Sequence, residues 1–258
     1  MKKRSFKKKS QVTLFIIFAI LIFISLISFF FLKIKSYPEK RLTINPQEQI
    51  ESCIKEELLK VLPIIMEQGG VFNPRKISDE SVLYEDKYTK YLCYSSGKRE
   101  KCFINTPLLK SSIEEEIEKA TIEGVKKCFE NLRKKLAGYD YKEEEQFNYS
   151  IEISPSFLTA KVNKEITISK GDSLKKFNSF VFKEPSPLFD FILITNDILV
   201  KEVSCNCGKE SCTADTLGLS NNNFKVSVFI AGNGEKVYKI EDMITKQKFK
   251  FAVRNCIP

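Results

Sequence analysis

The first strong feature of the chain is a long apolar segment near its N-terminus. Residues 12–32 contain no charged side chain, and their only polar members are Thr13, Ser25 and Ser28. At about 1.5 Å of rise per residue, a helix over this segment is roughly 31 Å long, which matches the hydrocarbon core of a bilayer. The pattern therefore predicts a transmembrane helix over residues 12–32.

The residues that follow this segment argue against a cleavable secretory signal. Such a signal has a shorter apolar region followed by small residues, whereas here Phe29-Phe30-Phe31-Leu32 leads directly into Lys33. We therefore expect the segment to remain as a permanent anchor, with residues 33–44 as a linker to the rest of the chain.

The distribution of basic residues predicts the orientation of this anchor. Six lysines and arginines lie within the first ten residues, without any acid, and four follow the apolar segment up to position 41. Cytoplasmic flanks carry the excess of Lys and Arg. Residues 1–11 are thus predicted as a cytoplasmic tail and residues 36–258 as extracytoplasmic. The expected location is the cell membrane, crossed once, with the lipid bilayer as a partner.

A helical period of apolar residues marks two further helices. The first begins at Asn45-Pro46-Gln47-Glu48, which supplies an N-cap, a first-turn proline and a third-position acid, and it ends at Gly69-Gly70. The second runs from Thr106-Pro107 to about Leu136. Residues 82–84 and 91–94 between them alternate as short strands do. Residues 45–140 are therefore predicted as a helical pair with an inserted hairpin.

Strand-like alternation dominates residues 145–258. Strands are predicted over residues 147–154, 157–163, 165–169, 177–182, 224–230, 234–240 and 248–253. The apolar run 188–203 is longer than a typical strand and is predicted as a helix. The fold class is α+β: one N-terminal transmembrane helix, the helical pair, and a mainly antiparallel β domain with a covering helix.

The cysteines give an independent indication of the compartment. There are eight, and all follow the anchor, at positions 53, 93, 102, 128, 205, 207, 212 and 256. An even count on the predicted outer side is typical of disulfides in an oxidising compartment. Cys53 and Cys128 lie beside the two apolar stripes, which favours a bridge between the helices, with two buried free thiols as the alternative. Cys93 and Cys102 flank a turn and are predicted to close a hairpin.

The last four cysteines allow two interpretations. The first is a pair of disulfides, Cys207–Cys212 and Cys205–Cys256. The second is a tetrahedral metal site built from the thiolates of Cys205, Cys207, Cys212 and Cys256. A Cys-x-Cys pair followed by x4-Cys is not a standard zinc-ribbon spacing, and free thiolates do not suit an oxidising compartment, so disulfides are favoured.

Composition excludes several functional classes. The formal net charge is +9, but six of the basic residues lie at the N-terminus. Without them the chain holds 36 basic and 33 acidic residues, and this balance does not indicate a nucleic-acid-binding protein. The chain has no histidine, which excludes Ser-His-Asp, Cys-His and HExxH chemistry. No cofactor and no enzymatic activity are expected. Asn148-Tyr149-Ser150 is an N-glycosylation sequon, so Asn148 is a candidate modification site.

Two segments resemble known families. Lys8-Lys9-Ser10-Gln11-Val12-Thr13-Leu14-Phe15 resembles the archaeal class III signal of type IV pilin-like proteins, which implies cleavage between Ser10 and Gln11 by a prepilin peptidase. Ser10 replaces the usual glycine, and Phe15 stands where pilins carry a glutamate that directs assembly. Residues 237–242 and 249–252 resemble a set of uncharacterised archaeal membrane-anchored proteins, a family without an assigned activity.

Together these patterns favour a non-enzymatic protein with a disulfide-stabilised ectodomain on a membrane anchor, acting in envelope structure, adhesion or ligand binding. Its expected partner, besides lipid, is a protein of the envelope or the cell surface. One alternative is a pilin-like subunit processed after Ser10. Another is an extracytoplasmic enzyme or metal-binding protein that uses the Cys205–Cys212 cluster.

Overall fold

The computed structural model describes residues 19–29, 44–76, 80–205, 207, 223–231 and 235–256. The chain divides into two compact units, Met1–Asn45 and Pro46–Pro258. In the first unit, residues 19–29 are helical and their side chains are exposed. Among the described residues, no helix is both long and apolar enough to cross a membrane. The predicted tail with Ser10 and Gln11, the rest of the predicted anchor, and linker residues 33–43 lie outside the described residues.

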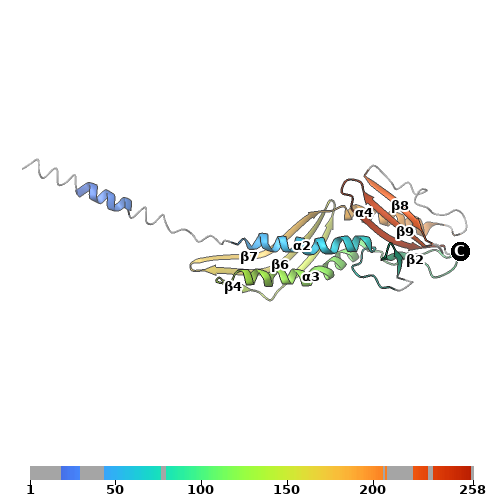
Figure 1. The fold of residues 1–258 in the computed structure, drawn as a ribbon, viewed down its shortest axis with the longest axis horizontal. Helices are drawn as coiled ribbons and strands as arrows, with labels where there is room; N and C mark the ends of the chain where they lie inside the picture. The colour runs from blue at the N-terminus through green and yellow to red at the C-terminus, as the bar shows by residue number, and fades with distance from the viewer. Residues whose placement is uncertain are drawn as a thin grey trace, which may run out of the picture. The chain divides into compact units, whose positions relative to one another are not determined.

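Two helices form one layer of the second unit (Figure 1). Helix α2 (Pro46–Glu67) and helix α3 (Leu109–Lys135) pack against each other along the predicted apolar stripes. Ile54 of α2 and Ile113 and Ile117 of α3 are fully buried. Both predicted helices are confirmed, because residues spaced three and four apart fall on one helical face.

A four-stranded antiparallel sheet contacts both helices. It contains β4 (Asp140–Glu143), β5 (Asn148–Ser154), β6 (Phe157–Lys170) and β7 (Ser173–Pro185). Strand β7 follows one edge of β6, while β5 and β4 pair with successive parts of the other edge. The predicted strands 157–163 and 165–169 are one strand in the structure. An irregularity between Asn163 and Ile166 shifts the register there without ending the pairing.

The second sheet combines strands from both ends of this unit. Its order is β1 (Ser81–Tyr84), β2 (Lys87–Tyr94), β10 (Lys248–Arg254), β9 (Glu235–Asp242) and β8 (Phe224–Ile230), and the short β3 (Phe103–Ile104) also pairs with β2. The pairing of β2 with β10 is parallel, and the others are antiparallel. The regions expected at 45–140 and 145–258 therefore share a sheet within one compact unit.

The two faces of this second sheet are covered by different elements. Helix α4 (Leu188–Ser204), the predicted covering helix, packs Phe191 against Phe224 and Phe249, with ring centroids 5.9 and 6.2 Å apart. On the other face the turn of the β1–β2 hairpin contacts β10, where Glu85 pairs with Lys250 at 2.6 Å. Because neighbouring residues of a strand point to opposite faces, β10 contacts α4 on one face and the β1–β2 turn on the other.

Candidate functional site

The chain leaves α2 through two glycines that bring the next loop close to β2 and α3. Gly69 and Gly70 have φ angles of +76° and +85°. A Cβ at Gly69 would lie 3.0 Å from the Cβ of Lys90, and a Cβ at Gly70 would lie 2.8 Å from Ile113. The Lys90 N–H also donates to the Gln68 carbonyl at 3.2 Å. Only glycine combines this backbone conformation with such close contact.

A cavity of about 310 Å³ lies where this loop, β2 and α3 meet. We call it the Lys90 cavity; its lining residues are Val71, Asn73, Pro74, Arg75, Glu80, Lys90, Tyr91, Asn105 and Glu116. These residues come from five separate stretches of the chain. The volume is at the lower end of the range typical of small-molecule sites.

Lys90 is the central cation of the cavity. Its side chain is half-buried, and this burial lowers the pKa of its ammonium, while the carboxylates of Glu116 and Glu80 act in the opposite direction. Within the described part of the chain, no side chain or carbonyl forms a hydrogen bond or ion pair with this ammonium. A half-buried charge without a direct partner is energetically unfavourable.

The other polar groups of the cavity are held by short local contacts. Arg75 pairs with Glu80 at 3.3 Å, and the Arg75 carbonyl accepts the Ser81 hydroxyl at 2.6 Å. Glu116 accepts the Phe72 N–H through Oε2 at 3.3 Å. The Asn105 N–H donates to the Leu92 carbonyl at 2.9 Å. These contacts hold part of the cavity wall, whose polar side chains besides Lys90 are two carboxylates, one guanidinium and two amides.

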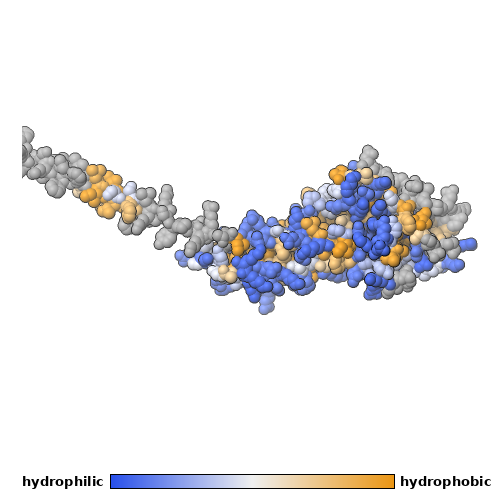
Figure 2. All heavy atoms as spheres, in the orientation of Figure 1, coloured by the Kyte–Doolittle hydropathy of each residue, from blue (hydrophilic) through white to orange (hydrophobic). Residues whose placement is uncertain are grey.

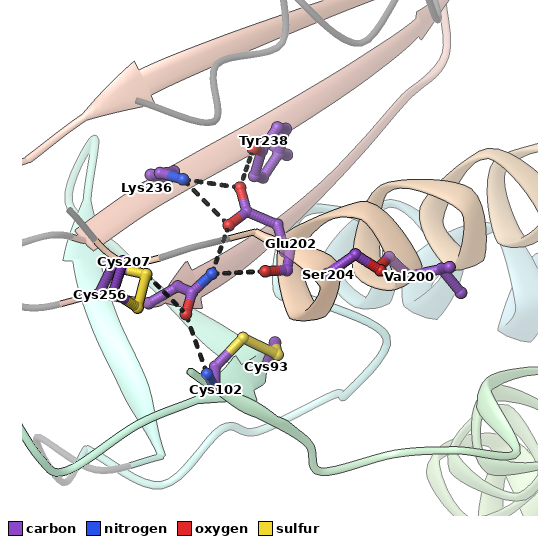
Figure 3. Close-up of a disulfide and its surroundings, with 10 residues drawn as sticks. Cys93, Cys102, Val200, Glu202, Ser204, Cys207, Lys236, Tyr238 and Cys256 are labelled. Atoms are coloured by element: carbon purple, nitrogen blue, oxygen red, sulfur yellow. Dashed lines mark hydrogen bonds and ion pairs between the residues drawn. A yellow bond between two sulfur atoms is a disulfide. The ribbon is translucent and has the colours of Figure 1, made fainter. Parts of the chain in front are cut away.

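A second polar cluster lies at the end of α4 (Figure 3). Glu202 is 1% exposed, and both of its carboxylate oxygens accept from Lys236, at 2.8 and 3.0 Å. The Tyr238 hydroxyl donates to Oε1, and the Asn255 amide donates to Oε2 at 3.0 Å and to the Glu202 carbonyl at 2.7 Å. Burial and the Glu202 charge raise the pKa of Tyr238, so it remains a proton donor.

The Glu202 cluster is closed by its own hydrogen bonds and has a structural role. Asn255 extends it by accepting the Cys102 N–H at 2.9 Å. The cluster thereby joins the last turn of α4, strand β9, the residues after β10, and the loop at Cys102. A carboxylate is tolerated in the interior when a cation and several hydrogen-bond donors contact it, as they do here.

Two disulfides flank this cluster (Figure 3). The predicted Cys93–Cys102 bond is present, with Cα atoms 5.4 Å apart. Cys256 bonds to Cys207, with Cα atoms 5.0 Å apart, so the predicted pairs Cys207–Cys212 and Cys205–Cys256 are wrong. The reason is long-range: Asn255 is tied to Glu202, which places Cys256 beside the chain that follows α4. Cys205 is also disulfide-bonded, and Cys212 lies outside the described residues.

The Cys207–Cys256 disulfide excludes the four-cysteine metal site that the sequence offered as an alternative. Cys207 and Cys256 are joined to each other and therefore cannot serve as thiolate ligands of a four-cysteine site. Among the residues that the structure describes, no three His, Cys, Asp or Glu side chains are grouped as a metal site would require.

The remaining predicted sites lie on α2, on α3 and on the four-stranded sheet. Cys53 and Cys128 form the predicted bridge between the two helices, with Cα atoms 5.8 Å apart. Asn148 is exposed at the first residue of β5, opposite Asn163.

The sequence analysis interpreted Gly69-Gly70 only as a helix end and did not single out Lys90. The signal that was available is the pair of glycines, because two in a row indicate a close approach of the backbone to another element.

Comparisons of this chain with protein families, with curated proteins and with solved structures give no match.

Proposed function

We propose that this chain is a membrane-anchored, extracytoplasmic, non-enzymatic protein whose disulfide-stabilised domain binds a small ligand. The observation that carries the proposal is the state of the cysteines. Every described cysteine is disulfide-bonded, including pairs that are 75 and 49 residues apart in the sequence. Bonds of this kind persist in oxidising compartments and are rare in the cytosol.

The apolar N-terminal segment supports the anchor. Every side chain of helical residues 19–29 is exposed, and the large ones include Phe23 at 66% and Phe29 at 59%. Figure 2 shows this stretch as mostly hydrophobic, whereas the visible face of the second unit is mainly hydrophilic. A continuous exposed apolar surface of this kind marks a contact with lipid or with another protein. The uncharged run over 12–32 and the cations before it favour lipid, with residues 36–258 outside.

Binding is favoured over catalysis by the two polar clusters. The Glu202 cluster has its carboxylate oxygens occupied by partners from its own chain. The Lys90 cavity has an ammonium that no described group pairs with, in a space of ligand size. The chain also lacks histidine, the commonest general base.

The test is an intact-mass measurement of the full chain extracted from native membranes, before and after alkylation and reduction. We expect the full-length mass, no alkylation before reduction, and alkylation of all eight cysteines after it. Alkylation of Cys53, Cys128 or Cys207 without reduction would overturn the proposal. A membrane-impermeant amine reagent on intact cells should label lysines beyond residue 36 and spare the five lysines within the first ten residues.

A pilin-like subunit is the second candidate, and the residues Lys8 to Phe15 are the observation that favours it. The same mass measurement separates the two. A chain that begins at Gln11 supports processing by a prepilin peptidase, whereas an intact N-terminus contradicts it.

A further inference from the structure

We infer that the Lys90 cavity binds a small zwitterion of the size of a free α-amino acid, with the ligand carboxylate on Lys90 and the ligand ammonium on Glu116. This inference rests on the proposed binding function and names the ligand class of that site.

The charges of the lining select a ligand with both signs. Two cations, Arg75 and Lys90, and two carboxylates, Glu80 and Glu116, line the cavity. A purely anionic ligand would lie near both carboxylates, and a purely cationic one near both cations, so each would meet repulsion. A neutral apolar ligand would displace water from Lys90 without offering it a partner. A zwitterion supplies an opposite charge to each group.

The existing contacts of each charged side chain show which of them can still bind a ligand. Arg75 and Glu80 already pair with each other, and their side chains are 75% and 46% exposed, so they form the rim of the cavity. Lys90 has no partner among the described residues. Glu116 uses Oε2 for the Phe72 N–H, and no described group donates to its Oε1. Lys90 and Glu116 are thus the two deeper groups with binding capacity left.

The remaining lining sets the size and the character of the ligand. Val71, Pro74 and the largely buried Tyr91 provide apolar surface, while Asn73 and Asn105 provide amides. A volume of about 310 Å³ is enough for an amino acid with a small or medium apolar side chain, and it leaves little room for a longer peptide.

The inference is tested by isothermal titration calorimetry of the full chain in a neutral detergent with three matched probes. L-Valine carries both charges, 3-methylbutanoate lacks only the ammonium, and 2-methylpropylamine lacks only the carboxylate. We expect L-valine to bind about tenfold more tightly than either counterpart, because each missing charge leaves one partly buried charged group of the cavity without an oppositely charged partner on the ligand.

Two variants of cavity residues, each with a matched control, test which side chain binds the carboxylate of the ligand and which binds its ammonium. Lys90→Met should weaken L-valine binding about tenfold or more, the loss of one charge-assisted hydrogen bond. Glu116→Gln can still accept the Phe72 N–H. It should weaken L-valine by a similar factor and should strengthen 3-methylbutanoate, because it removes a carboxylate that repels this anion. Lys161→Met and Glu115→Gln replace exposed residues outside the cavity and should leave all three affinities as they are.

Three outcomes would overturn the inference. They are no binding of L-valine, equal affinities for L-valine and 3-methylbutanoate, or equal effects of Lys90→Met and its control Lys161→Met. Far-UV circular dichroism of each variant establishes that it is folded. The cysteine alkylation result is independent of these titrations, so failure of the ligand class and failure of the proposed function are distinguishable.

Discussion

At the scale of single residues, Gly70 is constrained both by its backbone conformation and by packing against α3. A Cβ there would meet Ile113 at 2.8 Å, on a backbone with φ +85°. Gly138 has a similar φ of +95°, but a Cβ at that position would have no heavy atom within 4 Å. The two glycines therefore share the conformational requirement and differ in packing.

Gly70→Ala and Gly138→Ala separate these two effects. For Gly138→Ala we expect a loss of about 1–2 kcal/mol in the free energy of unfolding, from backbone strain alone. For Gly70→Ala we expect about 3 kcal/mol or more, because overpacking against Ile113 adds to that strain. Urea unfolding with the disulfides intact measures both. Equal losses would show that the contact with Ile113 is unimportant.

Ionisation of the buried Tyr149 hydroxyl makes the free energy of unfolding depend on pH in the alkaline range. It is 4% exposed and lies 2.8 Å from the Thr121 hydroxyl, which itself donates to Ile117. Burial raises the pKa of Tyr149 to about 12, from about 10 for a tyrosine in water. A group whose pKa is raised by folding contributes its stability fully below its unfolded pKa and loses it as pH rises toward the folded value.

We therefore expect the free energy of unfolding to fall between pH 9 and pH 11.5. The share of Tyr149 in that fall should be about 2 kcal/mol, from the two-unit difference in pKa. Tyr149→Phe should be less stable at pH 9, because it lacks the hydrogen bond to Thr121, but its stability should decline less steeply. Parallel pH profiles for the two proteins would contradict this role of Tyr149.

At the scale of elements, the disulfides differ in the length of chain that they close. Cys53–Cys128 joins α2 to α3 with a sequence separation of 75, whereas Cys93–Cys102 closes a hairpin with a separation of 9. In the loop-entropy account, a longer loop restricts the unfolded chain more strongly.

The double variants Cys53→Ala/Cys128→Ala and Cys93→Ala/Cys102→Ala test this difference. We expect losses of about 4 and about 3 kcal/mol in the free energy of unfolding, respectively. Far-UV circular dichroism in urea measures both. A larger loss for the hairpin bond would show that its place beside Asn255 and Glu202 matters more than loop length.

The elements also show what periodicity can and cannot predict. The helices over 46–67, 109–135 and 188–204 follow from apolar residues at helical spacing or from the length of the run. Cys53 and Cys128 lie along two such stripes, so their pairing could be predicted. The pairing of Cys207 with Cys256 could not be predicted, because it depends on the hydrogen bonds that Asn255, after β10, makes to Glu202 at the end of α4.

At the scale of the second unit, the parallel pairing of β2 with β10 joins its two halves. Tyr91 lies opposite Ala252, and the Ser95 N–H donates to the Arg254 carbonyl at 2.9 Å. The hairpin β1–β2 covers a face of the sheet that would otherwise expose Val237 and Ala252. Residues 46–140 therefore bury part of their apolar surface only against the C-terminal strands.

We expect a fragment of residues 46–140 to lack a cooperative unfolding transition, whereas residues 46–258 unfold in one step. The physical reason is that the fragment leaves the paired edge of β2 and the face of Tyr91 exposed. Thermal unfolding followed by circular dichroism compares the two. A sharp transition of the fragment alone would contradict the shared core.

The sequence by itself determined the positions of α2, α3, α4 and most strands, the α+β class, and the Cys53–Cys128 and Cys93–Cys102 disulfides. The short strands β3 and β4 were not predicted. These features depend on residues that are near in sequence, where a period of 3.6 or 2 fixes which side chains share a face. Tertiary structure decided the order of the strands, the parallel pairing of β2 with β10, the Cys207–Cys256 bond and the Lys90 cavity. Each of these brings together segments distant in sequence, and their contacts follow from the packing of whole layers, which no local pattern encodes.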